Sequence, residues 1–388
     1  MSLEFDYYYL GDLVKIKYGK NQKKVQDDEN GQYPIFGTGG LMGYSMEYLY
    51  DKPSVLIGRK GSIEKVRYIE EPFWTVDTLF YTEVNEKVVI PKFLYYVMSL
   101  IDLSRYNEGT SIPSLRTETL NRLDLPIPDL DYQNRVLSVL SKIDKKIEIN
   151  GKINKNLEEQ LSLIFDDIFV KCSQYEKEAL VKTDWGYIPK DWKNVDFGDL
   201  IQITSGDRPD EKSEVKTSEF NIPLFGASKI MGYTKESSYN EKILIIGRVG
   251  THGVIQRVNY PCFPSDNTFV IKSEYYGFVY QLLKRIDYDS LNTGSTQPLI
   301  TQKSLKTVNV ILPDKKTLFN FEKISNIFFD KIYIINNEIR SLTKLRDTLL
   351  PKLMSGEIDV SKINCDLKII IRKIYIKSSK LFLWRYFK

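Results

Sequence analysis

The sequence is poor in the residue types from which most catalytic and metal-binding sites are built. Its 388 residues include one histidine, His252, and three cysteines that stand far apart. A single histidine excludes a histidine-rich metal cluster, and three cysteines without paired spacing argue against a disulfide framework or a zinc site. The phosphate-binding pattern Gly-x-x-x-x-Gly-Lys-Ser/Thr is also missing, so ATP hydrolysis is not predicted. We expect no catalytic site, no metal site and no cofactor held by this chain.

Long apolar runs are missing as well. No stretch of eighteen apolar residues occurs before the last thirty residues, where Lys368, Arg372, Lys373 and Lys377 interrupt the pattern. A membrane span is therefore not predicted. The first six residues contain no basic stretch followed by an apolar run, which argues against a secretory signal or a transit peptide. A cytoplasmic location is expected.

Most of the chain lacks an excess of either charge sign. The formal charge of +4 arises from residues 359–388, which hold eight Lys or Arg and two Asp, whereas the other 358 residues carry 47 basic and 49 acidic side chains. Any DNA binding must then come from local patches or from basic partners. We interpret the basic tail after Ile358, residues 359–388, as a dispensable or read-through extension. An additional contact to DNA or to another subunit is the alternative.

The strongest positive feature is an internal repeat. Gly11 recurs as Gly198, 187 positions later, and further blocks follow in the same order at spacings of 185 to 189. An ordered series of this length indicates a duplication. The matched blocks are Gly11–Leu13 with Gly198–Leu200, Pro34–Gly37 with Pro223–Gly226, Met42–Tyr44 with Met231–Tyr233, Ile57–Gly61 with Ile246–Gly250, Gly109–Pro113 with Gly294–Pro298, and Leu125–Pro126 with Leu312–Pro313.

Each copy is predicted to begin with a globular domain of short strands. Residues 55–66 and 243–255 each contain two strand-like segments around a Gly-Arg-x-Gly turn, a pattern typical of β-hairpins. Proline ends both globular parts, at Leu125–Pro128 and Leu312–Pro313, because the residue before a proline disfavours helix.

A long helix is predicted after each domain. In the first helix, seam residues recur alternately every four and three positions, which is a heptad pattern. At about 1.5 Å per residue, forty helical residues reach roughly 60 Å. Gly151 and the seam residues Asn150 and Asn154 could mark a local irregularity. The seams are Val136, Leu140, Ile143, Ile147, Asn150, Asn154, Leu157, Leu161, Ile164 and Ile168, and less strictly Phe328, Ile332, Ile335, Ile339, Leu342, Leu345, Leu349 and Leu353.

The expected fold class is α+β, with two globular domains held apart by two long antiparallel coiled-coil helices. Antiparallel pairing is the economical way to connect these elements, and the duplication predicts an approximate two-fold relation between the domains. Such a helix pair would act as a spacer; a coiled coil that dimerises with another chain is the alternative. The predicted boundaries are 1–128 and 173–313 for the domains, 129–172 and 314–356 for the helices, and 357–388 for the tail.

Polar glycine loops at matched positions are the candidate binding sites. Glycine lets backbone amides approach a phosphate, while Ser, Thr, Gln and Arg donate to phosphates or base edges. Glycines needed only for turns would also recur, which is the alternative interpretation. The candidate DNA-binding residues are Thr38, Gly39, Arg59, Lys60, Ser62, Thr110, Ser111, Arg248, Thr251, His252, Ser295, Thr296 and Gln297.

Arg59 and Arg248 are the first of these residues to test, because they are matched cations within glycine turns. Arginine suits bidentate contact with guanine or with a phosphate. A salt bridge that braces the hairpin is the alternative for both. Asp77 and Asp266, also matched, are interpreted as residues that organise a loop.

Together these residues resemble the specificity subunits of type I restriction and modification enzymes, from about Leu10 to Ile358. The marks that carry the resemblance are the helix end 345–358, the segment 185–192 and the loop 294–298. The resemblance implies two target-recognition domains that each read one half of a bipartite DNA site. It further implies that the helices bind two methyltransferase subunits. Because the two domains differ between the shared blocks, the target is expected to be asymmetric.

The same resemblance places the chemistry in partner subunits. Adenine methylation with S-adenosylmethionine would belong to the methyltransferase subunits, and ATP- and Mg-dependent translocation and cleavage to restriction subunits. The chain departs from the family pattern at Gly109–Pro113, where the second copy has a glutamine, and in its tail. A specificity subunit of a methylation-only system is an alternative. So are a coiled-coil interaction protein that does not read DNA and a self-sufficient nuclease or methyltransferase.

Overall fold

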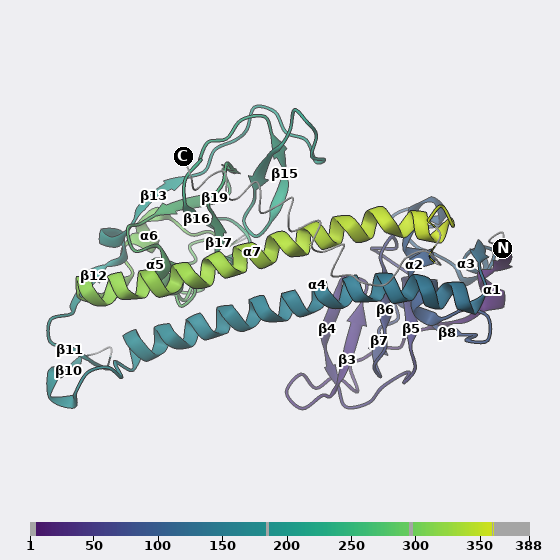
Figure 1. The fold of residues 1–388 in the computed structure, drawn as a ribbon. Coiled ribbons are helices and arrows are strands. Elements are labelled where there is room, and N and C mark those ends of the chain that lie inside the picture. Colours follow the sequence, from purple (N-terminus) through teal and green to yellow (C-terminus); the bar gives the residue numbers. More distant parts are fainter. Residues whose placement is uncertain (1–4, 184–185, 295–297, 359, 361–388) are drawn as a thin grey trace. The chain divides into compact units, whose positions relative to one another are not determined.

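The computed structural model describes residues 5–183, 186–294, 298–358 and 360, and the chain forms two compact units. Unit 1 comprises residues 1–150 and 337–388, and unit 2 comprises residues 151–336. Two long helices, α4 (Leu130–Phe165) and α7 (Lys315–Met354), contribute one part to each unit (Figure 1). Each unit therefore combines a globular part of short strands and helices with halves of both long helices, which confirms the predicted α+β class.

The globular part of unit 1 contains three small sheets. Its strands are β1 (Asp6–Tyr9), β2 (Val14–Tyr18), β3 (Tyr33–Gly37), β4 (Gly40–Ser45), β5 (Ser54–Gly58), β6 (Val66–Ile69), β7 (Trp74–Thr75), β8 (Leu79–Val84) and β9 (Asp124–Ile127). Its short helices are α1 (Leu10–Leu13), α2 (Pro91–Ser99) and α3 (Thr117–Asn121), with a 3-10 turn at Leu103–Tyr106. The sheet orders are β2-β8-β5-β6, β4-β3-β7 and β1-β9.

Unit 2 repeats this topology. Its strands are β10 (Leu180–Thr183), β11 (Gly186–Pro189), β12 (Lys193–Asp196), β13 (Gln202–Ser205), β14 (Ile222–Phe225), β15 (Ile230–Thr234), β16 (Ile243–Gly247), β17 (Gln256–Val258), β18 (Phe263–Pro264), β19 (Thr268–Lys272) and β20 (Asn309–Leu312). Its short helices are α5 (Tyr276–Leu283) and α6 (Gln302–Lys306), with 3-10 turns at Lys177–Ala179 and Phe197–Leu200 and a π-helical turn, Asp166–Val170, after α4. The sheet orders are β13-β19-β16-β17, β15-β14-β18, β12-β20 and β10-β11.

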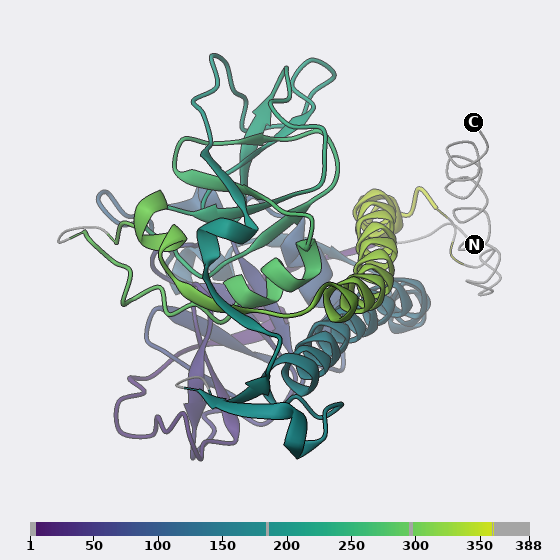
Figure 2. The same cartoon turned by 90° about the vertical axis from the view of Figure 1, so that its left-hand side faces the viewer.

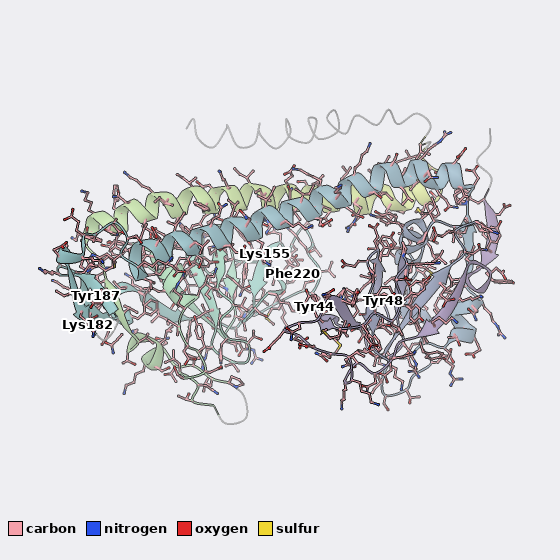
Figure 3. The ribbon with its side chains drawn as sticks, turned by 90° about the horizontal axis from the view of Figure 1, so that it is seen from below. Tyr44, Tyr48, Lys155, Lys182, Tyr187 and Phe220 are labelled. Carbon is pink, nitrogen blue, oxygen red and sulfur yellow. The ribbon has the colours of Figure 1, made fainter. Side chains whose placement is uncertain are left out.

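Three of the unit 2 sheets therefore correspond strand by strand to those of unit 1. The correspondence extends to detail, because the pairing of β3 with β4 shifts register between Ile35 and Phe36, and that of β14 with β15 shifts between Leu224 and Phe225. The β10–β11 hairpin has no counterpart in the described part of unit 1; its paired residues Lys182 and Tyr187 are labelled in Figure 3.

Both predicted hairpins are present, with longer loops than expected. β5 pairs antiparallel with β6, and β16 with β17. The loop between β5 and β6 spans residues 59–65, and Ile63, expected within a strand, is instead a buried loop residue. The chain passes back over Gly58, where an added Cβ would lie 2.5 Å from the carbonyl oxygen of Ser62. Because the chain makes this close approach first, the second strand begins only at Val66.

The core of unit 1 joins its globular part to both long helices. β5 is buried along its whole length, and Leu140 and Ile143 of α4 lie in the same apolar cluster as Leu350 and Leu353 of α7. Each fully buried leucine or isoleucine contributes roughly 1.5–3 kcal/mol. Tyr132, near the start of α4, donates from its hydroxyl to the carbonyl of Leu353 near the end of α7. Asn150, further along α4, donates to Glu338, which precedes Leu353 in α7. The helix segments of unit 1 therefore run antiparallel (Figure 1), and Figure 2 shows the same two helices foreshortened.

Unit 2 is built around an aromatic cluster. Phe165 of α4 packs against Phe278 of α5 and Phe321 of α7, with ring centroids 5.6 and 5.7 Å apart. Further along the same helices, Asn154 donates to Asn336 over 2.9 Å. Because Phe165 lies after Asn154 whereas Phe321 lies before Asn336, the helix segments run antiparallel here too.

The two long helices begin in the same way. Asp129 accepts a hydrogen bond from the Tyr132 amide at 2.7 Å, and Asp314, 185 positions later, accepts one from the Thr317 amide at 2.9 Å. Both are aspartate N-caps, which satisfy an amide that lacks a partner inside the helix. The duplication therefore includes the helix starts.

Helix α4 continues through Gly151 without the irregularity considered from the sequence. The seam asparagines find partners on α7, since Asn150 donates to Glu338 within unit 1 and Asn154 donates to Asn336 within unit 2, each at 2.9 Å. The side-chain nitrogens of both asparagines are therefore bonded across the seam, whereas Oδ1 of Asn154 is buried without a partner among the described residues.

A tyrosine fastens the globular part of each unit to a long helix. Tyr96 of α2 donates to Asp144 of α4, which also accepts from Arg346 of α7 at 3.2 Å. In unit 2, Tyr280 of α5 donates to Glu158 of α4 at 3.0 Å. Burial raises the pKa of Tyr96 and of Tyr280 above the ordinary tyrosine value, so both hydroxyls remain donors at neutral pH.

Among the described residues, none of the helices has the length and the apolar character that a membrane span requires.

Candidate nucleic-acid interface

The loop after β5 places the first predicted cation of unit 1. The Arg59 amide donates to the carbonyl of Thr78 at 2.9 Å, and its guanidinium donates to the carbonyl of Asp77 at 2.9 Å. The guanidinium also lies over the ring of Tyr18, 5.1 Å from the centroid. The carbonyl of Asp77, rather than its carboxylate, accepts this bond, so the loop is braced without a salt bridge. The next residue, Lys60, is exposed.

A second loop, residues 107–114, lies against this one. Gly61, with φ of +89°, donates from its amide to the carbonyl of Pro113 at 2.9 Å, and the Leu115 amide donates to the carbonyl of Arg59 at 2.9 Å. Thr110 and Ser111 are exposed at the tip of the loop. The structure therefore brings these two predicted residues to the loop that carries Arg59 and Lys60.

Asn107 organises the base of the second loop. Its side-chain oxygen accepts from the amides of Gly109 and Ser114, both at 2.9 Å, and its side-chain nitrogen donates to the carbonyl of Gly109 at 3.1 Å. Glu108 accepts from Thr119 and pairs with Arg116 at 3.1 Å. Both ends of the loop are therefore fixed by side chains as well as by backbone.

The third predicted loop of unit 1 is the turn between β3 and β4. Thr38 and Gly39 form a two-residue connection, because Gly37 pairs with Gly40. A Cβ added at Gly61 would lie 3.6 Å from the hydroxyl oxygen of Thr38, which places Thr38 beside the Arg59 loop. Gly39 is exposed and Ser62 is half-buried. Tyr44 and Tyr48, beyond this turn, are exposed (Figure 3).

Unit 2 repeats the backbone bonds that join the two central loops. The Arg248 amide donates to the carbonyl of Asn267 at 3.0 Å, Gly250 donates to the carbonyl of Pro298 at 3.0 Å, and Ile300 donates to the carbonyl of Arg248 at 2.9 Å. Asn292 accepts from the amides of Gly294 and Leu299, both at 2.9 Å, as Asn107 does in unit 1.

The Arg248 side chain differs from that of Arg59. Its guanidinium lies 5.7 Å from the centroid of Phe269, and its Nε is buried without a partner among the described residues. His252 stacks on Tyr288, and its Nδ1 lies 3.2 Å from the carbonyl oxygen of Gly247. Thr251 is exposed beside it.

Three predicted residues of unit 2, Ser295, Thr296 and Gln297, lie outside the described residues. The described residues on either side, Gly294 and Leu299, are both bonded to Asn292. Sequence reasoning did not identify Asn107 and Asn292, although a signal was present: each asparagine stands two positions before a matched glycine, and the pair recurs at a spacing of 185.

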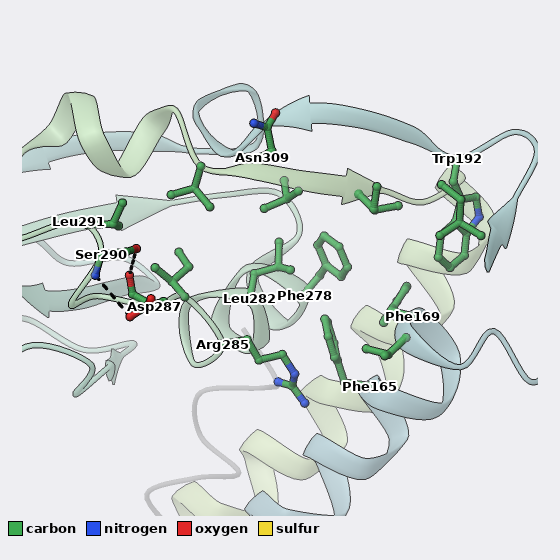
Figure 4. A pocket seen from close by; sticks show the side chains of 16 residues that line it. Phe165, Phe169, Trp192, Phe278, Leu282, Arg285, Asp287, Ser290, Leu291 and Asn309 are labelled. Atoms are coloured by element: carbon green, nitrogen blue, oxygen red, sulfur yellow. Dashed lines mark hydrogen bonds between the residues drawn. The ribbon is translucent and has the colours of Figure 1, made fainter. Parts of the chain in front are cut away.

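Unit 2 also contains a pocket of about 470 Å³ (Figure 4). Phe165, Phe169, Trp192 and Phe278 give it an apolar lining. Of the charged groups at its edge, Arg285 is bonded to Asp166, Ser162 and Gln281, and Asp287 accepts from the amides of Asp289 and Ser290. Ligand sites combine an apolar wall with convergent polar groups that are free to bind. Because Arg285 is already engaged, the loops remain the candidate site.

The site offers amides, hydroxyls and cations rather than an acid–base pair. Across the described part of the chain, no three His, Cys, Asp or Glu side chains gather in a way that could hold a metal ion. Backbone amides at glycines, hydroxyls and guanidinium groups are the donors that contact phosphates and base edges. The arrangement fits recognition of a nucleic acid.

Comparison with known proteins supports this interpretation. The family model described as "Type I restriction modification DNA specificity domain" matches residues 3–159 and again residues 189–345. The chain is similar to the MjaIX specificity subunit of Methanocaldococcus jannaschii, with 27% identity over 81% of this chain and 80% of that protein. It is also similar to the HindI specificity subunit of Haemophilus influenzae, with 21% identity over 74% and 81%.

A solved structure has the same fold. The S subunit of a type I restriction-modification system from M. genitalium matches with a TM-score of 0.57 and 19% identity, covering 91% of this chain and 96% of that one. The two matches to the family model coincide with the two copies of the sheet topology.

Proposed function

This chain belongs to the type I restriction-modification DNA specificity family and is a specificity subunit, and we propose that each of its units reads one half of a bipartite DNA target. In unit 1 the half-site is contacted by the turn at Thr38, by the loop that carries Arg59 and Lys60, and by the loop tip at Thr110 and Ser111. In unit 2 the corresponding loops contact the other half-site. Binding residues are commonly presented on loops that a rigid sheet holds in position.

The observation that carries this proposal is a repeated loop scaffold with different side chains at its tips. Asn107 and Asn292 hold their loops with the same pair of amide bonds. Between these anchors, the sequence after the glycine is Thr-Ser-Ile-Pro in the first copy and Ser-Thr-Gln-Pro in the second. The same anchoring bonds with different residues between them suit one task performed on two different base sequences, so the target is asymmetric.

The chemistry of the system is proposed to lie in partner subunits. The long helices bind two methyltransferase subunits, which hold S-adenosylmethionine and methylate adenine, and restriction subunits supply ATP- and Mg-dependent cleavage. This chain is then non-catalytic, and its helices set the spacing between the two half-sites. The family membership of the chain is what supports this division of labour.

Mapping methylated adenines tests the proposal. The chain is co-expressed with the methyltransferase of its own host, the complex is purified, and methylated adenines are mapped across the genome. A bipartite target with two unlike halves is expected. Replacing residues 1–128 with the first domain of a relative should then change one half of the target and leave the other unchanged. A change in both halves, or methylation without sequence preference, would contradict the reading of one half-site by each unit.

A further inference from the structure

The tip of loop 107–114 in unit 1 exposes an isoleucine. Ile112 is 61% exposed, although it lies between Ser111 and Pro113 in a loop that is otherwise polar. A single exposed apolar residue is common on protein surfaces and needs no explanation by itself. Ile112 differs because the loop holds it firmly and because that loop belongs to the candidate interface.

The backbone leaves Ile112 little freedom to turn inward. A Cβ added at Gly109 would lie 1.9 Å from the carbonyl oxygen of Ile112, so only glycine permits this close packing of the two ends of the tip. Pro113 restricts the backbone of the residue before it to extended conformations. The carbonyl of Pro113 accepts from Gly61, and Asn107 fixes Gly109 and Ser114. Ile112 is therefore presented outward by a rigid loop.

The surroundings of Ile112 indicate what it contacts. Its neighbours on the tip are the hydroxyl residues Thr110 and Ser111, and the adjoining loop carries Arg59 and Lys60. A protein interface has an apolar core of several residues, and loop 107–114 contributes only one exposed large apolar side chain, Ile112. In the DNA major groove, the apolar group on a base edge is the 5-methyl group of thymine, and apolar side chains contact it.

We propose that Ile112 is a specificity-determining residue that contacts the methyl group of a thymine in the half-site read by unit 1. This inference rests on the proposed function, because it presumes that loop 107–114 enters a groove. The repeat supports it from the sequence alone: position 112 corresponds to Gln297, 185 positions later, and glutamine suits adenine. One loop position then reads a methyl group in the first domain and a base edge that hydrogen-bonds in the second.

The test removes the methyl group from the DNA and the side chain from the protein. The full chain in complex with its methyltransferase subunits is titrated with duplexes of the mapped target, in which uracil replaces each thymine in turn. At one thymine of a single half-site, uracil is expected to weaken binding by the wild-type complex about fourfold, the effect of one buried methyl-sized group. Ile112→Ala should bind the thymine duplex about as weakly and should not respond to uracil at that position.

Two further variants sharpen the result. Leu100→Ala removes another exposed apolar side chain of unit 1, 46% exposed and outside the loops, and should respond to uracil as the wild type does. Ile112→Ser serves as a second truncation in case the alanine variant unfolds, and should lose the uracil response as well.

The outcomes separate this inference from the proposed function. If the wild-type complex methylates a bipartite site but no thymine in either half responds to uracil, or if Ile112→Ala and Ile112→Ser keep the full response, Ile112 is not the reader and the proposed function still stands. If the wild-type complex shows no sequence preference, the proposed function fails and the inference fails with it.

Discussion

At the scale of single residues, the Arg59 side chain braces its loop and keeps further donors that DNA could accept. Its guanidinium uses one N–H on the carbonyl of Asp77 and one face on Tyr18, which leaves other donors for a phosphate or a guanine. Arg59→Ala is expected to weaken DNA binding by the assembled complex by about 1 to 3 kcal/mol and to relax one target position. Binding titrations against single-base variants of the target measure both effects. Unchanged affinity and specificity would leave Arg59 with a structural role alone.

Asp314 gives a prediction for the dependence of stability on pH. Burial alone would raise its pKa, but hydrogen bonds from Thr317, Tyr175 and Trp192 outweigh this and hold the pKa of Asp314 below its ordinary value. Asp314→Asn keeps an N-cap oxygen but loses the charge that strengthens these hydrogen bonds, and should lower the free energy of unfolding by about 1 kcal/mol at pH 7.

The advantage of the wild-type aspartate requires the charged carboxylate. It is present above the unfolded pKa of about 4 and is lost as the pH falls through the lower folded value. Urea unfolding of both proteins at pH 7 and at about pH 3 checks this. A difference that stays constant between the two pH values would show that the charge of Asp314 does not matter.

The sequence identified the exposed tip residues of unit 1 but not the residue that fixes them. Thr110 and Ser111 were recognisable because hydroxyl residues beside a repeated glycine suggest DNA contacts. The role of Asn107 depends on which amides lie near its side chain after folding, and those of Gly109 and Ser114 come together only when the loop closes. Likewise, the contact of Arg59 with Tyr18 joins residues that are distant in the sequence.

At the scale of elements, Gly151 is a helix-interior glycine without a packing reason. A Cβ added there meets nothing within 4 Å, and its φ lies in the ordinary negative range. Gly151→Ala should therefore stabilise α4 by about 0.5–1 kcal/mol, because alanine loses less backbone entropy in a helix. Thermal unfolding should show a raised Tm. Gly109→Ala is the matched contrast and should be destabilising, since its Cβ would meet the carbonyl oxygen of Ile112.

The helices and hairpins were predictable because their patterns are local. The heptad seam indicated a continuous segment, and α4 with its π-helical turn runs from Leu130 to Val170. The parallel pairing of β3 with β7 was not predictable, because β7 has only two residues, Trp74–Thr75, and its partner is far away in the sequence. Two residues carry no periodicity, so only the folded unit shows that they form a strand.

At the scale of the whole molecule, charge predicts how the chain depends on its partners. Without residues 359–388 the chain carries 47 basic and 49 acidic side chains, so long-range attraction to DNA is weak. The purified chain alone should bind DNA weakly and with little sequence preference. The complex with methyltransferase subunits should bind its target on the order of a thousandfold more tightly than unrelated DNA. Titrations of both at one salt concentration make the comparison. Tight, sequence-specific binding by the isolated chain would contradict the expectation.

The division of α7 between the units also determines which unit can fold first during synthesis. Unit 2 is one continuous stretch of chain, residues 151–336, whereas unit 1 needs residues from both ends of the sequence. During synthesis, unit 2 has all its residues first, while the apolar side chains of early α4 await Leu342, Leu350 and Leu353. A ribosome that stops soon after Asn336 would therefore release a protein whose second half can fold and whose first half has an open core, exposed to proteases and to aggregation.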